Sequence, residues 1–483
     1  MATEDDETKP LISVNETTIR KVSFIRGAVP CGIIMMLYFL SGFIFISWIP
    51  QYVHQRLYES YTNSSSKSNH YVYSCNRTES DNNTLLEIKL QKETSERVVY
   101  YSYANSLPTL LVNLVMGSYS DSIGRKLFFV IPIIGCLGKG VVSMLVVKLN
   151  LDLNYFYLAY GLEGIGGSFS TFLLATYAYT ADITPPKNKR TLAIAALEVL
   201  LATGTISGKF ATGLLIKSTG FFFPMVLNSG LGLLTLLFVI FFLVETTHGS
   251  EDSGKSPLSH LKNVFGFYLL TGSRRRRLQY VIVMLIFCLG LVGRFGRDNT
   301  ETLYVLNQPF CWLPDKIGYF GALRTGLTSL VTMLFIKACL TCLRDEYIIA
   351  TGMLGEIGGL VLEAMATSDL MMWLVPVVSS SEATSSPITR SMLSRMTSPS
   401  QQGAVFASIA TLETITNFVA NTMYGLIYSA TVGGSVRGAV FLIMSVWPFL
   451  AIVASISHVF VAEKETEDTV VVVEDPGKQN VSC

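Results

Sequence analysis

The chain has 483 residues, of which 50% are hydrophobic and only 15% are charged, and its mean hydropathy is +0.45. These values exclude a water-soluble chain of this length and predict an all-α membrane protein. The formal net charge of +1 says little about function, because the charges of a membrane protein act according to the side of the membrane on which they lie.

Apolar stretches that are long enough to cross the hydrocarbon core, which takes about 20 helical residues, recur about twelve times. We expect spans at 27–50, 99–119, 127–148, 155–180, 191–216, 221–244, 278–297, 317–340, 347–367, 370–396, 403–429 and 437–461. The first stretch follows a long polar segment and is too long for the apolar core of a signal peptide. We therefore expect it to remain as the first span.

Basic residues near the span ends predict the orientation. They precede spans one and seven and follow spans two and four: Lys21, Arg26, Arg125, Lys126, Lys187, Lys189, Arg190 and Arg274 to Arg277. Because positive charge favours the cytoplasmic side, both termini are expected in the cytoplasm.

The polar stretch 245–277 separates six predicted spans from six others and has the composition of a linker. We therefore predict two six-helix bundles, at 27–244 and 278–461, joined by a cytoplasmic linker. The tail 1–26 and the acidic tail 462–483 are expected in the cytoplasm, and the loop 51–98 on the outer, exofacial side.

The loop 51–98 carries three sequons for N-glycosylation, at Asn63, Asn76 and Asn82. Among the eight cysteines, only Cys75 and Cys311 fall in predicted exofacial loops, where oxidation is possible. We predict that these two form a disulfide that joins the two bundles outside the membrane. Two unpaired thiols are the alternative.

The short charged turn between spans two and three runs from Gly117 to Lys126. Asp121 can end a helix, Gly124 allows a sharp reversal, and Arg125 and Lys126 favour the cytoplasmic side. The turn resembles the loop signature of the major facilitator superfamily, and a capped loop with cytoplasmic positive charge is the simpler alternative.

Asp182, at the cytoplasmic end of span four, could pair with Arg190 or with Arg125 of this turn. We favour a role in gating for Asp182 and the turn together.

Several further stretches, in their order and spacing, resemble the proton-coupled folate transporter family, which is solute carrier family 46. They are Cys75-Asn-Arg-Thr, Glu301-Thr-Leu-Tyr304, Pro309-Phe-Cys311-Trp312, Gly318-Tyr319, Arg390-Ser-Met-Leu-Ser-Arg395, Gln402-Gly403 and Phe406. The likeness spans most of residues 28–461. It implies a symporter that carries folates or other organic anions inward together with protons, by alternating access between the two halves.

Ionisable residues inside membrane spans are costly and usually functional. Glu198 in span five could exchange protons, and the resemblance places it at the family's proton-coupling acid. A helix-end carboxylate that reaches cytoplasmic water is the alternative. Arg390 in span ten can hold a carboxylate and matches the family's arginine for coupling and substrate binding. The alternative for Arg390 is an arginine that extends to the cytoplasmic interface.

Arg294 in span seven stands where folate-carrying members have a histidine, which argues against folate itself. It is either a second substrate-binding cation or an exofacial helix-end arginine. The sequence contains no metal-ligand spacing, nucleophile elbow or phosphate-binding glycine loop. We therefore predict no enzyme, no metal, no nucleic-acid-binding domain, and no cofactor apart from the co-transported proton.

The predicted partners are the lipid bilayer, the proton and a bulky organic anion, which could be folate-like, a conjugated steroid or bile acid, or a cyclic dinucleotide. A facilitative transporter without protons and a non-transporting receptor or scaffold are the alternative functions. The N-terminal tail residues Glu7, Leu11 and Ile12 fit an acidic dileucine signal for a cytoplasmic sorting adaptor. This signal favours a lysosomal or endosomal membrane over the plasma membrane.

Overall fold

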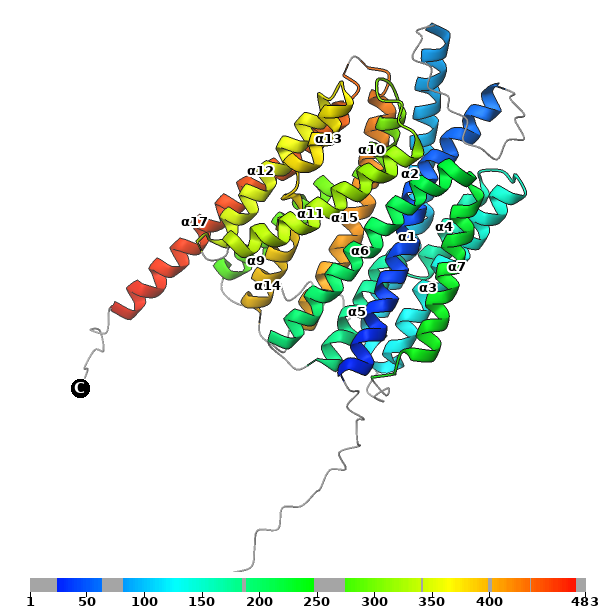
Figure 1. Cartoon of the computed structure of the whole chain (residues 1–483). Helices are drawn as coiled ribbons and strands as arrows, with labels where there is room; N and C mark the ends of the chain where they lie inside the picture. The colour runs from blue at the N-terminus through cyan, green and yellow to red at the C-terminus, as the bar shows by residue number, and fades with distance from the viewer. Residues whose placement is uncertain are drawn as a thin grey trace, which may run out of the picture.

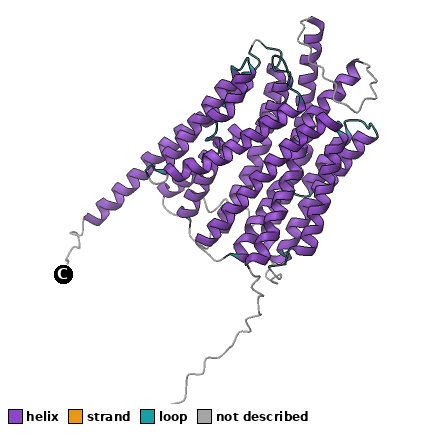
Figure 2. Ribbon diagram, viewed as in Figure 1, coloured by secondary structure: helices purple, strands orange, loops and turns teal. Residues whose placement is uncertain are grey.

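The computed structural model describes residues 24–62, 81–184, 188–246, 274–339, 342–397, 402–434 and 436–474. Within these ranges the chain forms helices joined by short loops and contains no strand (Figure 2). Helices of the first half of the chain lie on one side of the bundle and those of the second half on the other (Figure 1). The predicted all-α class is confirmed.

The first half packs α1 against α6 and α7, and α3 against α4 and α7. Its helices are α1 (Phe24–Thr62), α2 (Asp81–Ile123), α3 (Arg125–Lys148), α4 (Tyr155–Ile165), α5 (Ser168–Ile183), α6 (Asn188–Thr219) and α7 (Phe222–Phe242). The expected loop 51–98 is instead helical over 51–62 and 81–98, where α1 and α2 continue past their predicted spans. Buried contacts such as that between His54 and Glu87, 3.0 Å apart, hold these polar extensions together.

The second half packs α9 and α12 against α17. Its helices are α9 (Arg274–Arg294), α10 (Arg297–Leu306), α11 (Pro314–Cys339), α12 (Asp345–Ala364), α13 (Asp369–Val378), the short 3-10 helix η1 (Glu382–Thr384), α14 (Ser385–Met396), α15 (Gln402–Thr431), α16 (Ala439–Met444) and α17 (Val446–Glu474).

Judged by length and composition alone, eight segments of the described chain are long and apolar enough to cross a membrane. The sequence predicts about twelve spans. The other four predicted spans fall on α2, α4 with α5, α13 with α14, and α15. Two of them are broken into shorter pieces. Gly167, with φ of +81°, separates α4 from α5, and η1 separates α13 from α14. These breaks place irregular backbone inside the bundle, which is tolerated where protein surrounds it.

The two halves meet mainly where α6 packs on α11 and α2 packs on α15. At the α6–α11 contact, a Cβ atom on Gly213 would lie 2.5 Å from the carbonyl oxygen of Pro314, so the backbones touch directly. At the α2–α15 contact, Ser95 donates to the carbonyl oxygen of Gly425 at 2.7 Å. Both contacts lie toward the predicted exofacial side, where they hold the halves together.

Candidate functional site

Glu198 lies on α6 and accepts a short hydrogen bond from the hydroxyl of Tyr177 on α5. The carboxylate is exposed rather than enclosed by its own half of the protein. The phenol therefore orients a carboxylate that other groups can still reach, which is the arrangement that a proton-exchanging acid needs.

Arg390 lies on α14 and pairs with Glu413 on α15. One terminal guanidinium nitrogen lies 2.9 Å from both carboxylate oxygens. The guanidinium also lies over the ring of Phe287, 5.6 Å from its centre. The Nε donor of Arg390 is buried and makes no hydrogen bond with the described residues. Arg390 thus keeps an unused donor beside a carboxylate that a substrate anion could replace.

These two pairs belong to opposite halves of the chain and act on each other. Glu413 acts most strongly on the guanidinium of Arg390, and the carboxylate of Glu198 in the first half also acts on it. Next to Glu413, Thr414 accepts a hydrogen bond of 3.1 Å from Asn113 on α2, which also joins the halves. The structure therefore brings the predicted residues Glu198 and Arg390 to one interhelical site, together with Tyr177 and Glu413.

The turn between α2 and α3 binds two carboxylates. Arg125 Nε lies 2.9 Å from Asp182 Oδ2, which is one of the two pairings expected. The backbone N–H groups of Arg125 and Lys126 donate to Glu245 at 2.7 and 3.0 Å, so Glu245 neutralises the N-terminus of α3. Gly124, with φ of +106°, lets the carboxylate approach.

The other residues of the predicted signature are placed less fully. Gly117 and Asp121 belong to α2, and the side chains of Asp121 and Arg190 are not described. The structure thus tests the pairing of Asp182 but not the whole predicted gating group.

Arg294 ends α9 and does not join the site around Arg390. Its charge acts on Glu356 and Glu382 of the second half. The role of Arg294 as a second substrate-binding cation stays a prediction.

Two buried lysines of the first half were missed by the sequence analysis. Lys139 on α3 pairs with Glu163 on α4 at 2.6 Å and lies 4.3 Å from the ring centre of Phe45. Lys209 on α6 pairs with Asp298 on α10 at 2.9 Å. The sequence could have indicated both lysines, because each lies inside a predicted membrane span, where a charged residue is rare.

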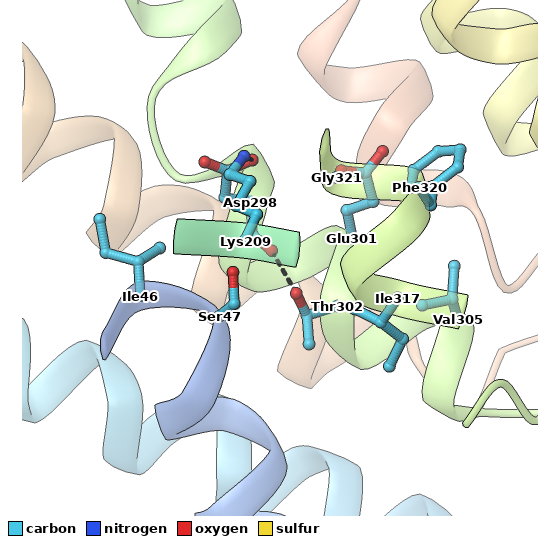
Figure 3. A pocket seen from close by; sticks show the side chains of 10 residues that line it. All are labelled: Ile46, Ser47, Lys209, Asp298, Glu301, Thr302, Val305, Ile317, Phe320 and Gly321. Carbon is cyan, nitrogen blue, oxygen red and sulfur yellow. Dashed lines mark hydrogen bonds and ion pairs between the residues drawn. The ribbon is translucent and has the colours of Figure 1, made fainter. Parts of the chain in front are cut away.

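A small pocket lies beside the Lys209–Asp298 pair, between α1, α6, α10 and α11 (Figure 3). Its lining residues are Ile46, Ser47, Lys209, Asp298, Glu301, Thr302, Val305, Ile317, Phe320 and Gly321. The pocket therefore contacts both halves of the chain at their boundary.

Several predictions fall outside the described residues. Glu7, Leu11, Ile12, Asn63, Cys75 and Asn76 are not described, and Asn82 is described only as part of α2. Cys311 is disulfide-bonded, but its partner is not among the described residues. The pairing with Cys75 stays a prediction.

Comparison with known proteins identifies the family. Residues 100–307 match the family model of the Major Facilitator Superfamily. The chain is 32% identical to the lysosomal proton-coupled steroid conjugate and bile acid symporter SLC46A3 of Gallus gallus, over 83% of this chain and 87% of that protein. The chain belongs to solute carrier family 46.

Other relatives agree with this membership. The proton-coupled folate transporter of Rattus norvegicus is 27% identical over 70% of this chain and 73% of its own length. As a member of solute carrier family 46, the protein is a multi-pass membrane transporter, and the prediction of a transporter rather than an enzyme is confirmed.

Solved structures support the fold alone. The human organic anion transporter MFSD10 aligns with a TM-score of 0.62 and 15% identity, covering 89% of this chain and 99% of that one. A D-xylose-proton symporter aligns with a TM-score of 0.63 and 13% identity, covering 90% and 97%. The predicted major facilitator fold is therefore confirmed.

Proposed function

We propose that this transporter is a proton-coupled symporter that moves a bulky organic anion into the cytosol by alternating access. The observation that carries the proposal is that Tyr177 bonds to Glu198 in one half, Arg390 pairs with Glu413 in the other, and Glu198 acts electrostatically on Arg390. A proton-accepting carboxylate and an anion-binding guanidinium then share one site between the moving halves.

Substrate binding would begin at Arg390. An anionic group can accept from its buried Nε donor and compete with Glu413 for the guanidinium. Displacing Glu413 leaves its carboxylate without a cation. Protonation of Glu413 or of the neighbouring Glu198 then becomes more favourable. Binding of the anion and binding of a proton would in this way support each other.

Glu198 would carry the coupled proton. Its exposed carboxylate already accepts from Tyr177, and the phenol can keep it oriented in either protonation state. An outer compartment about two pH units more acidic than the cytosol supplies about 2.7 kcal/mol per proton. One proton can therefore support an anion gradient of about a hundredfold.

The relatives support the substrate class and the location. The two named activities among them are proton-coupled transport of steroid conjugates and bile acids and proton-coupled transport of folate. We propose a conjugated steroid or bile acid rather than folate, because the relative of 32% identity carries the former in its name. The name of this relative also describes it as lysosomal. This location agrees with the predicted sorting signal at Leu11 and Ile12.

The gating turn would close the cytoplasmic ends of the helices. Arg125 joins α3 to Asp182 of α5, and Glu245 joins α3 to the end of α7. These bonds would fix the cytoplasmic ends of the first half as one body, so that the half can move as a unit.

The test is uptake of labelled organic anions by cells that express the protein at their surface. Leu11→Ala with Ile12→Ala would redirect it, and uptake would be measured at two external pH values about two units apart. We expect acid-stimulated uptake of a steroid conjugate or bile acid that Glu198→Gln reduces at least about tenfold, the equivalent of about 1.4 kcal/mol.

Glu93→Gln is the matched control, because Glu93 pairs with Arg97 on the predicted exofacial extension of α2, far along the helix from Asn113. Uptake that is equal at both pH values and in Glu198→Gln would favour facilitative transport without protons. Surface-expressed protein that takes up none of the anions would favour the receptor or scaffold.

A further inference from the structure

The second half contains a buried charge cluster that the proposed site does not include. Its members lie on α10, α11, α12 and η1, and each side chain is at most 8% exposed: Arg297, Glu301, Arg324, Glu363 and Glu382. Charged groups this deep are stable only when they are paired.

The two arginines of the cluster pair with three carboxylates. Arg297 donates to Glu363 through Nε at 3.0 Å and to Glu382 through Nη1 at 2.9 Å. Arg324 donates to Glu301 at 2.7 Å and to Glu382 at 3.3 Å. One oxygen each of Glu301 and Glu363 is buried without a hydrogen-bond partner. If all were ionised, the cluster would have an excess negative charge.

Glu356 extends this imbalance. It lies on α12, two helical turns before Glu363, and it is 0% exposed. Both of its carboxyl oxygens are buried without any hydrogen-bond partner. It packs against Gly293 on α9, where a Cβ atom would lie 2.7 Å from Oε1. No side chain in the described part of the chain would donate a hydrogen bond to an ionised Glu356.

Charged and titratable groups face Glu356 from several of the helices around it. They are Arg294 on α9, Arg297 on α10, Arg324 on α11, Glu363 on its own helix, Glu382 on η1 and Tyr424 on α15. Farther groups on the packed helices are paired elsewhere, namely His458 with Glu346 and Arg390 with Glu413.

The charge balance then requires a proton. Even with Arg294 included, three guanidinium groups face four carboxyl groups: Glu301, Glu356, Glu363 and Glu382. An isolated buried carboxylate costs several kcal/mol, whereas its neutral acid costs far less. Glu356, which touches no donor and no cation, is the carboxyl group that is best kept neutral.

We propose that Glu356 is a second proton-binding site, located in the C-terminal half, and that the transport cycle loads and releases its proton. The inference rests on the proposed symport and adds to it a second coupled proton. The ligand is the proton itself, and the release is driven by rearrangement of the arginines that face Glu356.

The helix α10 provides the link between this proton and the movement of the halves. It begins after Gly296, whose φ of +80° breaks the chain away from α9. Arg297 then points to the buried cluster, whereas the next residue, Asp298, pairs with Lys209 of the first half. Glu301, one turn further on, lines the pocket at the boundary (Figure 3).

Movement of α6 away from α10 would therefore shift Arg297 through its neighbour Asp298. When Arg297 moves relative to Glu363 and Glu382, the field at Glu356 changes, and its proton becomes easier to lose or to gain. The pocket at the boundary reaches the charge cluster at Glu301, one of its lining residues.

Infrared spectroscopy of the purified protein in lipid tests the proton directly. A protonated carboxylic acid has its own C=O stretching band, and we expect Glu356→Gln to remove one such band from the wild-type spectrum. Glu346→Gln on the same helix is the matched control, because Glu346 is ion-paired with His458 and should contribute no such band. Gln is neutral and nearly isosteric, so folding should survive. Glu356→Asp, which keeps a titratable group, provides a second variant.

Accumulation of the substrate tests the coupling. If two protons are coupled, a pH difference of about two units supports a gradient near ten-thousandfold, and loss of one lowers the ceiling about a hundredfold. Glu356→Gln should therefore lower the accumulation ratio steeply and keep exchange of labelled for unlabelled substrate.

If Glu356→Gln keeps every C=O band of a protonated carboxylic acid that the wild type shows, Glu356 does not hold a proton and the proposal is wrong. A band that disappears without any change in the accumulation ratio would also overturn the proposal, because the proton would then be structural. A wild-type protein that transports no anion would refute the proposed symport, and pH titration of the infrared band would still show whether Glu356 binds and releases a proton.

Discussion

Lys209 of α6 and Asp298 of α10 form an ion pair of 2.9 Å across the boundary between the two halves of the chain. The lysine side chain is 8% exposed and the aspartate 41% exposed, so the ammonium depends on this one carboxylate more than the carboxylate depends on it. The pair lies on the same two helices that carry the tight α6–α11 contact and the break before α10.

Removing only the carboxylate should therefore be more harmful than removing both charges. We expect Asp298→Asn to lower the free energy of unfolding by about 3 kcal/mol, because it leaves a buried ammonium unpaired. The double variant Lys209→Met with Asp298→Asn should regain most of that loss. Thermal unfolding of the purified protein measures both changes.

The pair of Lys217 on α6 with Asp315 on α11 is the control, and Lys217→Met should change little because the lysine side chain is 52% exposed. If Asp298→Asn and the double variant unfold alike, the ion pair does not stabilise the boundary.

The helical extensions outside the membrane should be most stable above the titration range of Glu87. Burial by itself would raise the pKa of Glu87, but the charge of His54 and hydrogen bonds from His54 and Gln91 outweigh it and hold the pKa below the ordinary value of 4.5. A lowered folded-state pKa adds stability at pH values above 4.5, and this stability is lost as the pH falls through the lower folded value.

The pair of His54 and Glu87 should thus survive in a moderately acidic compartment. We expect the thermal midpoint of the wild type to fall only below about pH 4.5, and Glu87→Gln to lose that part of the pH dependence. Glu93→Gln, at a half-buried pair on the same helix, should keep the wild-type profile. If the pH dependence of the thermal midpoint is unchanged in Glu87→Gln, Glu87 does not cause the loss of stability in acid.

Gly124 should not tolerate a side chain. Its φ of +106° is strained for other residues, and a Cβ atom would lie 3.0 Å from Glu245 Oε2. Gly124→Ala should cost about 1–3 kcal/mol and weaken the carboxylate bond to the start of α3. Gly230→Ala on α7, where no atom lies within 4 Å, is the control and should be neutral or slightly stabilising. Similar losses in both variants would show that Glu245 does not require Gly124.

Cys75 is the predicted partner of Cys311. Cys75→Ser should free one thiol that reacts with a maleimide after the protein is denatured without reductant, and Cys483→Ser should leave Cys311 protected. Mass spectrometry of the labelled peptides identifies the freed cysteine. A protected Cys311 in Cys75→Ser would assign its disulfide to another residue.

The fold was predictable because the apolar spans are read directly from the chain, whereas the breaks within them are not. Glu198 and Arg390 could be named from their place inside predicted spans, but their partners Tyr177 and Glu413 could not, because pairing across helices depends on tertiary packing. The disulfide partner and the sorting signal were predicted only from topology and pattern.

Arg297 shows why the second charge cluster was missed. The predicted seventh span ends at 297, so the sequence alone gives no reason to place this arginine inside the protein. In the structure the helix breaks at Gly296, and Arg297 starts a second helix that points the guanidinium inward. Arg324 stood inside the predicted span 317–340 and could have been found by the rule that intramembrane charges are functional.

Gly213 and Gly318 hold α6 and α11 together through backbone atoms, with a Cβ atom on Gly213 only 2.9 Å from the Cα of Gly318. Separation of such a contact exposes little apolar side-chain surface, so its free-energy cost is small and arises mainly from the neighbouring ion pairs. In the proposed transport cycle, the outward-open and inward-open populations can therefore stay nearly equal, and a few kcal/mol from one proton or one bound anion would be enough to reverse their ratio.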